Sequence, residues 1–124
     1  MIKATELTKL LQIELLSKPN LDAIVISTGD GGILSAAINQ EKINMDDVQI
    51  VTAILVSALN EYNTTDHSCS NFYMETEKGK FMVGEFQNEN LFLVMWFEST
   101  TSIGIIYTLF ESLMNYLIYN NLKC

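Results

Sequence analysis

Residues 21–38 (LDAIVISTGDGGILSAAI) constrain the fold most, because two apolar runs lie on either side of a short, polar, glycine-rich segment. Residues 23–26 and 33–34 carry the aliphatic and β-branched side chains that favour strands. The segment between them, TGDGG at 28–32, contains an Asp-Gly step, which is a strong hairpin signal because glycine reaches the positive φ of tight primed turns. We therefore predict the first hairpin of a sheet here.

Helical spacing of apolar residues predicts three helices. In residues 3–17, the leucines at 7, 10, 11 and 15 form one stripe, and Pro19 ends the helix. A second helix is expected over 47–62, with Asp46 or Asp47 as its N-cap. A third is expected over 102–119, after a run of Ser and Thr side chains that can cap it. Its predicted apolar face consists of Ile103, Ile106, Tyr107, Phe110, Leu113, Met114 and Leu117.

The second helix is more apolar than one buried face requires. One stripe, predicted to cover the sheet, consists of Val48, Val51, Leu55, Ala58, Leu59 and Tyr62. Outside it lie Ile50, Ala53, Ile54 and Val56, beside the small Ser57. Such a helix is either enclosed on all sides by its own domain or packed on its sheet with a second face against a partner. A domain of about this size has few places to enclose a helix, so we favour the partner.

Three strands are predicted over 70–77, 80–87 and 91–98, joined by turns of two or three residues that require antiparallel neighbours. The run LFLVMWF at 91–97 is typical of a central strand covered on both faces. The predicted fold class is α+β: an α/β sandwich with a five-stranded antiparallel sheet and the order α-β-β-α-β-β-β-α. Residues 1–124 are expected to form a single domain, with the first hairpin on the side of the sheet away from the partner-binding elements.

Charge narrows the classes of partner. The net charge is −8 and all seven basic residues are lysines, so the surface repels phosphate backbones and anionic lipids. We therefore expect neither nucleic-acid binding nor direct membrane insertion. The longest apolar run is far shorter than the ~20 residues of a membrane span, which favours a soluble, intracellular protein. The absence of arginine excludes an arginine finger supplied by this chain.

No motif points to catalysis, a cofactor or a metal. TGDGG lacks a following Lys-Ser/Thr and leads into a strand, so a hairpin turn explains it better than a phosphate loop. Cys69, Cys124 and the single histidine, His67, show no metal-ligand spacing. Glu75 and Glu77 share a strand face, a pattern more typical of a charge-protected edge strand than of an acid/base pair. The sequence thus predicts a non-enzyme.

Three blocks resemble a known family: AIVISTGDGGILSAAI at the first hairpin, VTAILVSALNEY on the second helix and NLFLVMWFESTTSIGIIYTLFESLMNYL at the end. With this order of elements the chain resembles the roadblock/LC7 family over nearly its whole length. The last block is similar to the roadblock-type adaptor subunits of the late-endosomal Ragulator scaffold. The resemblance implies a roadblock/longin-like fold that dimerises through the second helix and the following strand.

In such a dimer the helices pair and the two sheets join into one. Carried over residue by residue, the implied interface comprises Ile50, Ala53, Ile54 and Ser57 on the helix and Phe72 and Met74 on the strand. The implied partners are a second copy or another roadblock-domain protein, and a small Ras-like GTPase. The chain would be a non-catalytic scaffold or adaptor subunit, cytoplasmic and held at the late endosomal or lysosomal surface by its partners.

Two alternatives stay open. One is a roadblock subunit of the dynein light-chain type. The other is a small-molecule sensor of the GAF or PAS kind, which also wraps helices around a five-stranded antiparallel sheet. A sensor pocket needs convergent polar groups in an apolar cavity. The strand residues expected to point inward are all apolar: Ile24, Ile26, Leu91, Leu93 and Met95.

Overall fold

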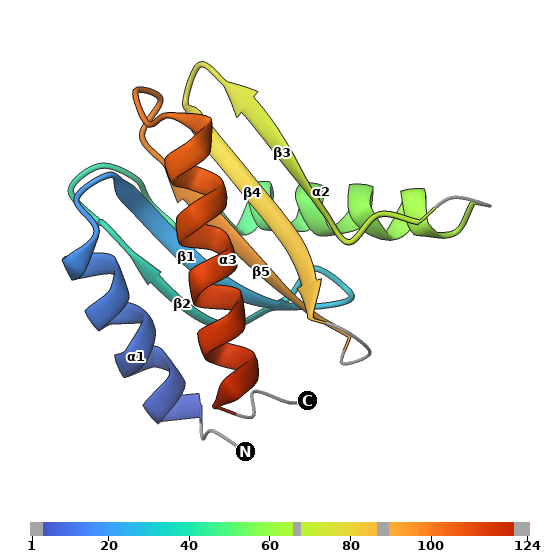
Figure 1. The fold of residues 1–124 in the computed structure, drawn as a ribbon, viewed down its shortest axis with the longest axis horizontal. Helices are drawn as coiled ribbons and strands as arrows, with labels where there is room; N and C mark the ends of the chain where they lie inside the picture. Colours follow the sequence, from blue (N-terminus) through green and yellow to red (C-terminus); the bar gives the residue numbers. More distant parts are fainter. Residues whose placement is uncertain (1–3, 66–67, 87–89, 121–124) are drawn as a thin grey trace.

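The computed structural model describes residues 4–65, 68–86 and 90–120. The predicted order of elements is confirmed (Figure 1). The elements are α1 (Ala4–Ser17), β1 (Leu21–Thr28), β2 (Ile33–Ile38), α2 (Met45–Asn63), β3 (Asn71–Thr76), β4 (Gly79–Phe86), β5 (Leu91–Phe97) and α3 (Ile103–Tyr119). Strand and helix ends differ from the predicted ones by one or two residues, as expected where ends are frayed.

The five strands form one sheet in the order β2-β1-β5-β4-β3, and every neighbouring pair is antiparallel. β5 lies at the centre, and all seven of its residues are buried. The uninterrupted apolar run of this strand therefore reflects cover on both faces of the sheet, as predicted. β2 and β3 are the two edges, so the first hairpin and β3 lie at opposite ends of the sheet.

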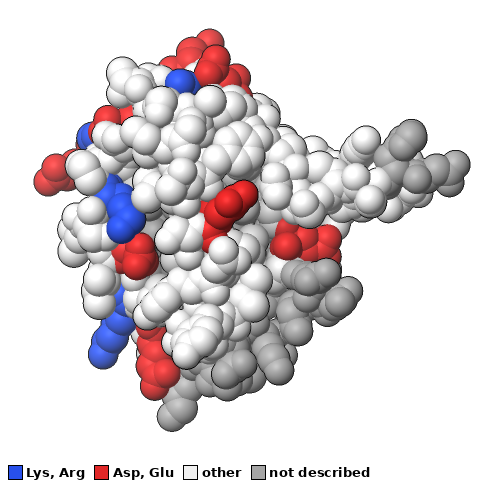
Figure 2. All heavy atoms as spheres, in the orientation of Figure 1, with Lys and Arg blue, Asp and Glu red and all other residues white. Residues whose placement is uncertain are grey.

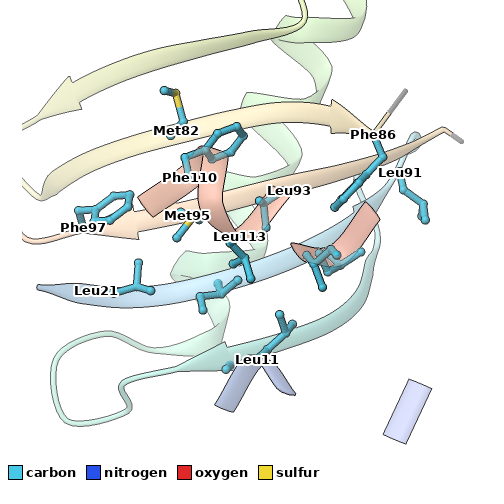
Figure 3. Packing of buried hydrophobic residues seen from close by; sticks show 14 of the residues in the cluster. Leu11, Leu21, Met82, Phe86, Leu91, Leu93, Met95, Phe97, Phe110 and Leu113 are labelled. Atoms are coloured by element: carbon cyan, nitrogen blue, oxygen red, sulfur yellow. The ribbon is translucent and has the colours of Figure 1, made fainter. Parts of the chain in front are cut away.

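α1 and α3 cover one face of the sheet and α2 crosses the other (Figure 1). Alternate residues of β5 supply the two cores, because successive side chains of a strand point to opposite faces. The larger core, under α1 and α3, includes the side chains labelled in Figure 3: Leu11, Leu21, Met82, Phe86, Leu91, Leu93, Met95, Phe97, Phe110 and Leu113. The smaller core, under α2, consists of Ala23, Val25, Val48, Leu55, Val56, Leu59, Phe81, Val83, Phe92, Val94 and Trp96.

The rotation of α2 about its axis differs from the predicted one. Its sheet-facing row consists of Val48, Thr52, Leu55, Val56 and Leu59. Val56, predicted to lie outside this row, is fully buried, whereas Ala58 and Tyr62, predicted to lie in it, are exposed. Val48, Leu55 and Leu59 are buried as predicted, and Val51 is half-buried against the same core. The prediction was wrong for Val56, Ala58 and Tyr62, because the count of apolar residues passed over Thr52, which the sheet buries.

Two further predictions need correction. The N-cap of α2 is Asn44, whose side chain accepts a hydrogen bond from the backbone N–H of Asp47 at 2.8 Å, and neither Asp46 nor Asp47 has this role. In α3, Ile106, Phe110, Leu113 and Leu117 are buried as predicted. Ile103 and Tyr107 instead lie on its exposed side, because they fall just beyond the arc that the sheet covers.

The first hairpin turns through four residues, 29–32, and not through a two-residue primed turn. Gly31 N–H donates to the carbonyl of Thr28 at 3.0 Å, and Thr28 N–H donates to the carbonyl of Gly32 at 2.9 Å. Only Gly31 in this loop has a positive φ, of 88°. This is the pattern of longer hairpin loops, in which a tight turn is followed by one left-handed residue, usually glycine.

Candidate partner-binding face of α2 and β3

Four of the predicted interface residues lie together on the solvent side of α2. Ile50 and Ile54 are 59% and 58% exposed, and the small residues Ala53 and Ser57 beside them are also exposed. Their spacing of three and four residues places them along one side of the helix, opposite the sheet-facing row. We refer to Ile50, Ala53, Ile54 and Ser57 as the α2 outer face.

The α2 outer face combines large aliphatic side chains with small ones. Small residues at a helix surface let a second backbone approach closely, and the flanking isoleucines then supply apolar contact area. Ala58 and Tyr62, which the sequence prediction assigned to the sheet side, are also exposed and widen this surface. Figures 1 and 2 show the C-terminal end of α2 projecting from the body of the molecule, so this part of the helix is accessible.

The two predicted strand residues lie at the open edge of the same side of the sheet. Phe72 and Met74 are half-buried and pack against the smaller core beneath α2. They pair with Val83 and Phe81 of β4, while no strand among the described residues pairs with the opposite side of β3. An edge strand offers unpaired backbone groups to a further strand. The structure thus brings a free strand edge and an apolar helix face to one side of the domain.

The tip of the first hairpin borders this face, which the sequence prediction had placed away from it. The side-chain N–H of Asn60 donates to the carbonyl of Gly29 at 2.8 Å. A Cβ added to Gly31 would lie 3.2 Å from Cα of Ala53, so the close approach of turn and helix needs a small residue here. This contact is tertiary, joining residues about thirty apart in the chain, and local patterning carries no signal for it.

A hollow of about 290 Å³ lies where the hairpin tip meets α2. Its lining includes Asp30 from the turn and Ser57 and Glu61 from the helix. The pKa of the exposed Asp30 carboxyl is lowered, first by the hydroxyl of Thr28 and then by the backbone N–H of Gly32, which donates at 3.0 Å. Asp30 is therefore a persistent negative charge at the rim of the α2 outer face.

The start of α2 is fixed by a second polar cluster. Lys42, in the connection from β2 to α2, forms ion pairs with Glu98 and with Asp22 of β1, whose Oδ1 lies 3.7 Å from the lysine nitrogen. Asp22 is only 6% exposed, and burial raises its pKa although the charge of Lys42 opposes this. The cluster ties the β2–α2 connection to the ends of β1 and β5.

Within the described parts of the chain, no three His, Cys, Asp or Glu side chains come together in a way that could hold a metal ion. Cys69 is a free thiol whose Sγ donates to the carbonyl of Asn71. His67 and Cys124 lie outside the described residues. Among the helices that are described, none is both long and apolar enough to cross a bilayer.

No protein-family model and no curated protein sequence matches the chain. Solved structures do. A roadblock/LC7 domain from Streptomyces avermitilis superposes with a TM-score of 0.72 at 10% identity, covering 91% of this chain and 95% of that one. MglB from Myxococcus xanthus gives a TM-score of 0.72 at 17% identity, covering 100% and 97%.

A profilin from Schizosaccharomyces pombe is also similar, with a TM-score of 0.61 at 16% identity over 93% of this chain and 98% of that one. Such low identities establish the fold and leave function open. Of these three structures, the roadblock domain and MglB superpose on the five-stranded antiparallel sheet and three helices of this chain with higher TM-scores than the profilin. The chain therefore has the fold of roadblock/LC7 domains.

Proposed function

We propose that this chain is a non-catalytic adaptor domain of the roadblock/LC7 type. It dimerises, with a second copy or with another roadblock chain, through the α2 outer face and the free edge of β3. The observation that carries the proposal is the pair of half-exposed isoleucines, Ile50 and Ile54, set among small residues on the solvent side of α2. An isolated domain gains nothing from holding such side chains in water.

Oligomerisation is consistent with the structural relatives. One MglB structure, with a TM-score of 0.74 at 13% identity, is described as having a tetrameric arrangement. The edge position of β3 also favours joining the sheets of two subunits, since strand addition satisfies the backbone groups of both edges. Phe72 and Met74, half-buried at that edge, would then complete their burial in the dimer.

The finer part of the proposal rests on the resemblance of the sequence to roadblock adaptors. In this finer proposal the dimer is a platform for a small Ras-like GTPase within a Ragulator-like complex. That complex would hold the chain at the late endosomal or lysosomal surface. A chain without arginine cannot supply an arginine finger to a GTPase active site. This absence favours a platform that binds the GTPase over a subunit that takes part in its catalysis.

The first test is Ile54→Asp, which puts a charge at the centre of the α2 outer face. At about 1 M salt the screening length is about 3 Å, so association there depends on apolar contact more than on surface charge. We expect the wild-type chain to self-associate in sedimentation velocity at high concentration and Ile54→Asp to remain monomeric. The matched control is Ile118→Asp on α3, a residue 51% exposed on the opposite face, which should behave as wild type.

The second test identifies the partner by affinity capture from source cells with the same three proteins. We expect a second chain of roadblock type, and a small GTPase with it, to be retained by wild type and by Ile118→Asp and lost with Ile54→Asp. If wild type is strictly monomeric and all three proteins capture the same chains, the α2 outer face is not a docking surface and the proposal is wrong.

A further inference from the structure

The α2 outer face is apolar in the middle and acidic at both ends. Asp46 lies exposed in the first turn of α2 and Glu61 lies exposed near its end. Asp30 of the hairpin tip shares the hollow with Glu61 and adds a second negative charge there. No residue of α2 is basic. Fifteen residues at about 1.5 Å each separate Asp46 from Glu61 by roughly 22 Å.

Glu61, near the end of α2, does not favour the helix that carries it. A carboxylate in the first turn, such as Asp46, stabilises a helix through its dipole, whereas one in the last turn, such as Glu61, opposes it. No ion pair between Glu61 and a lysine occurs within residues 4–65, 68–86 and 90–120. Glu61 therefore opposes the dipole of its own helix, and since no ion-pair partner for it lies among the described residues, its charge is available to another chain.

Two copies of this chain would present like charges to each other. A two-fold dimer uses the same patch on both subunits. If the two α2 helices run antiparallel, the Asp46 end of one faces the Glu61 and Asp30 end of the other. If they run parallel, Asp46 faces Asp46 and Glu61 faces Glu61. In either arrangement acid meets acid at both ends of the apolar contact, which is how interfaces reject a wrong partner.

We propose that the α2 outer face selects a different chain, one whose docking helix has apolar and small residues at its centre and Lys or Arg at both ends. This inference rests on the proposed docking role of α2 and adds the chemistry of the partner. The charges on the partner lie roughly 22 Å apart to meet the two acidic ends. They speed association and fix the register of the helices, while the apolar centre supplies the contact area.

A charge-reversed copy of the chain serves as the basic partner in the test. Asp46→Lys combined with Glu61→Lys gives a helix with the same apolar centre and basic ends. At low ionic strength we expect this variant to bind wild type about tenfold more tightly than wild type binds itself, because two exposed charge contacts turn from repulsive to attractive. Sedimentation equilibrium of the mixture and of each protein alone measures this, and far-ultraviolet circular dichroism checks folding.

The matched control reverses the same number of charges on the other face of the sheet. Glu6→Lys combined with Glu111→Lys changes an exposed first-turn residue of α1 and an exposed residue of α3, and its mixture with wild type should bind no more tightly than wild type alone. We also expect self-association of wild type to strengthen as salt is added.

The outcomes separate this inference from the proposed function. Charge selection is wrong if wild type forms a homodimer whose affinity does not change with salt, and if wild type binds the charge-reversed variant no more tightly than it binds itself. If that homodimer is still lost with Ile54→Asp, the α2 outer face remains the docking surface. If wild type and the charge-reversed variant still associate when both carry Ile54→Asp, the α2 outer face is not the docking surface.

Discussion

The helices on the two faces of the sheet carry opposite patterns on their solvent sides. In α2 the exposed middle is apolar, with Ile50, Ala53 and Ile54, and the ends are acidic. In α3 the exposed middle is polar, while large apolar side chains lie exposed near the two ends. The polar middle comprises Thr108, Glu111, Ser112 and Asn115, and the exposed apolar residues are Ile103, Ile105, Tyr107, Tyr116, Ile118 and Tyr119.

The two helices also differ in what holds them on the sheet. α3 shares its face with α1 and is held by a close apolar fit, in which Phe110 packs over Gly84 of β4. α2 covers its face without a second described helix, and in addition to its buried row it has a polar contact near each end. Lys42, just before its start, pairs with Asp22 of β1 and with Glu98 after β5, and Asn60 near its end donates to the hairpin tip. A helix mounted in this way can keep its apolar middle free for another chain.

The largest expected effect separates the two sides of α2 itself. Leu55 is buried in the smaller core, and its neighbour Ile54 is 58% exposed. Leu55→Ala should lower the free energy of unfolding by about 2–5 kcal/mol, because it removes buried methyl groups and leaves a cavity. Ile54→Ala should change it by no more than about 0.5 kcal/mol. Urea denaturation at low protein concentration, where association is weak, measures both.

If Ile54→Ala lowers the free energy of unfolding as much as Leu55→Ala does, the distinction between the α2 outer face and the sheet-facing row is contradicted. It would mean that the α2 outer face is already covered in the protein at that concentration. Repeating the unfolding at a hundredfold higher concentration then shows whether the cover is another copy, since the stability of an oligomer depends on concentration.

On the face of the sheet covered by α3, we expect the packing of α3 on β4, and not association with another chain, to control stability. A Cβ added to Gly84 would lie 2.7 Å from Cζ of Phe110 and 3.1 Å from Cβ of Asn71, so Gly84→Ala should destabilise the fold by about 1–3 kcal/mol. Gly104, in the first turn of α3, has open space around it. Gly104→Ala should therefore stabilise the protein by up to about 1 kcal/mol through helix propensity.

The cause can be isolated with a double-mutant cycle. If the ring of Phe110 is what the new methyl group meets, Phe110→Leu should cost less in the Gly84→Ala background than in wild type, by about 0.5–3 kcal/mol of coupling. Additive effects would show that the strain lies in the backbone of β4. Thermal and urea unfolding of the four proteins give the cycle.

The order of elements and the layers could be predicted from the sequence, and the reason is physical. β5 has seven consecutive apolar residues, which only a strand covered on both faces can bury, and short turns left antiparallel pairing as the one arrangement for β3, β4 and β5. The row Ile24, Ile26, Leu91, Leu93 and Met95, predicted to point inward, is indeed buried in the larger core.

The rotation of α2 could not be read from the sequence in the same way. A helix with apolar residues on nearly every side has no unique sheet-facing row, and the surface of the sheet decides the phase. Here it buries Thr52 and Val56 and leaves Tyr62 out. The contact of Gly31 with Ala53 is likewise tertiary. The proposed interface residues stay a prediction.

The smallest expected effect concerns two aspartates near the ends of β1, which lie beside the start and the end of α2. The pKa of Asp22 is raised, chiefly by burial, so its ionised form costs stability, and this cost disappears as pH falls through the raised folded-state pKa toward the ordinary value of 3.8. The pKa of Asp30 is lowered, so its contribution is present above 3.8 and is lost as pH falls below that value.

Asn substitutions should therefore show opposite signs. Asp22→Asn should be more stable than wild type near neutral pH by less than about 1 kcal/mol, with the gain vanishing as the pH approaches 3.8. Asp30→Asn should be slightly less stable near neutral pH, and should lose that deficit only below 3.8. Thermal melts between about pH 3 and 7 at fixed ionic strength test both, because that range includes the ordinary carboxyl pKa. A curve for Asp22→Asn that runs parallel to wild type would show that Lys42 compensates the buried charge fully, and that the start of α2 is held by a neutralised ion cluster.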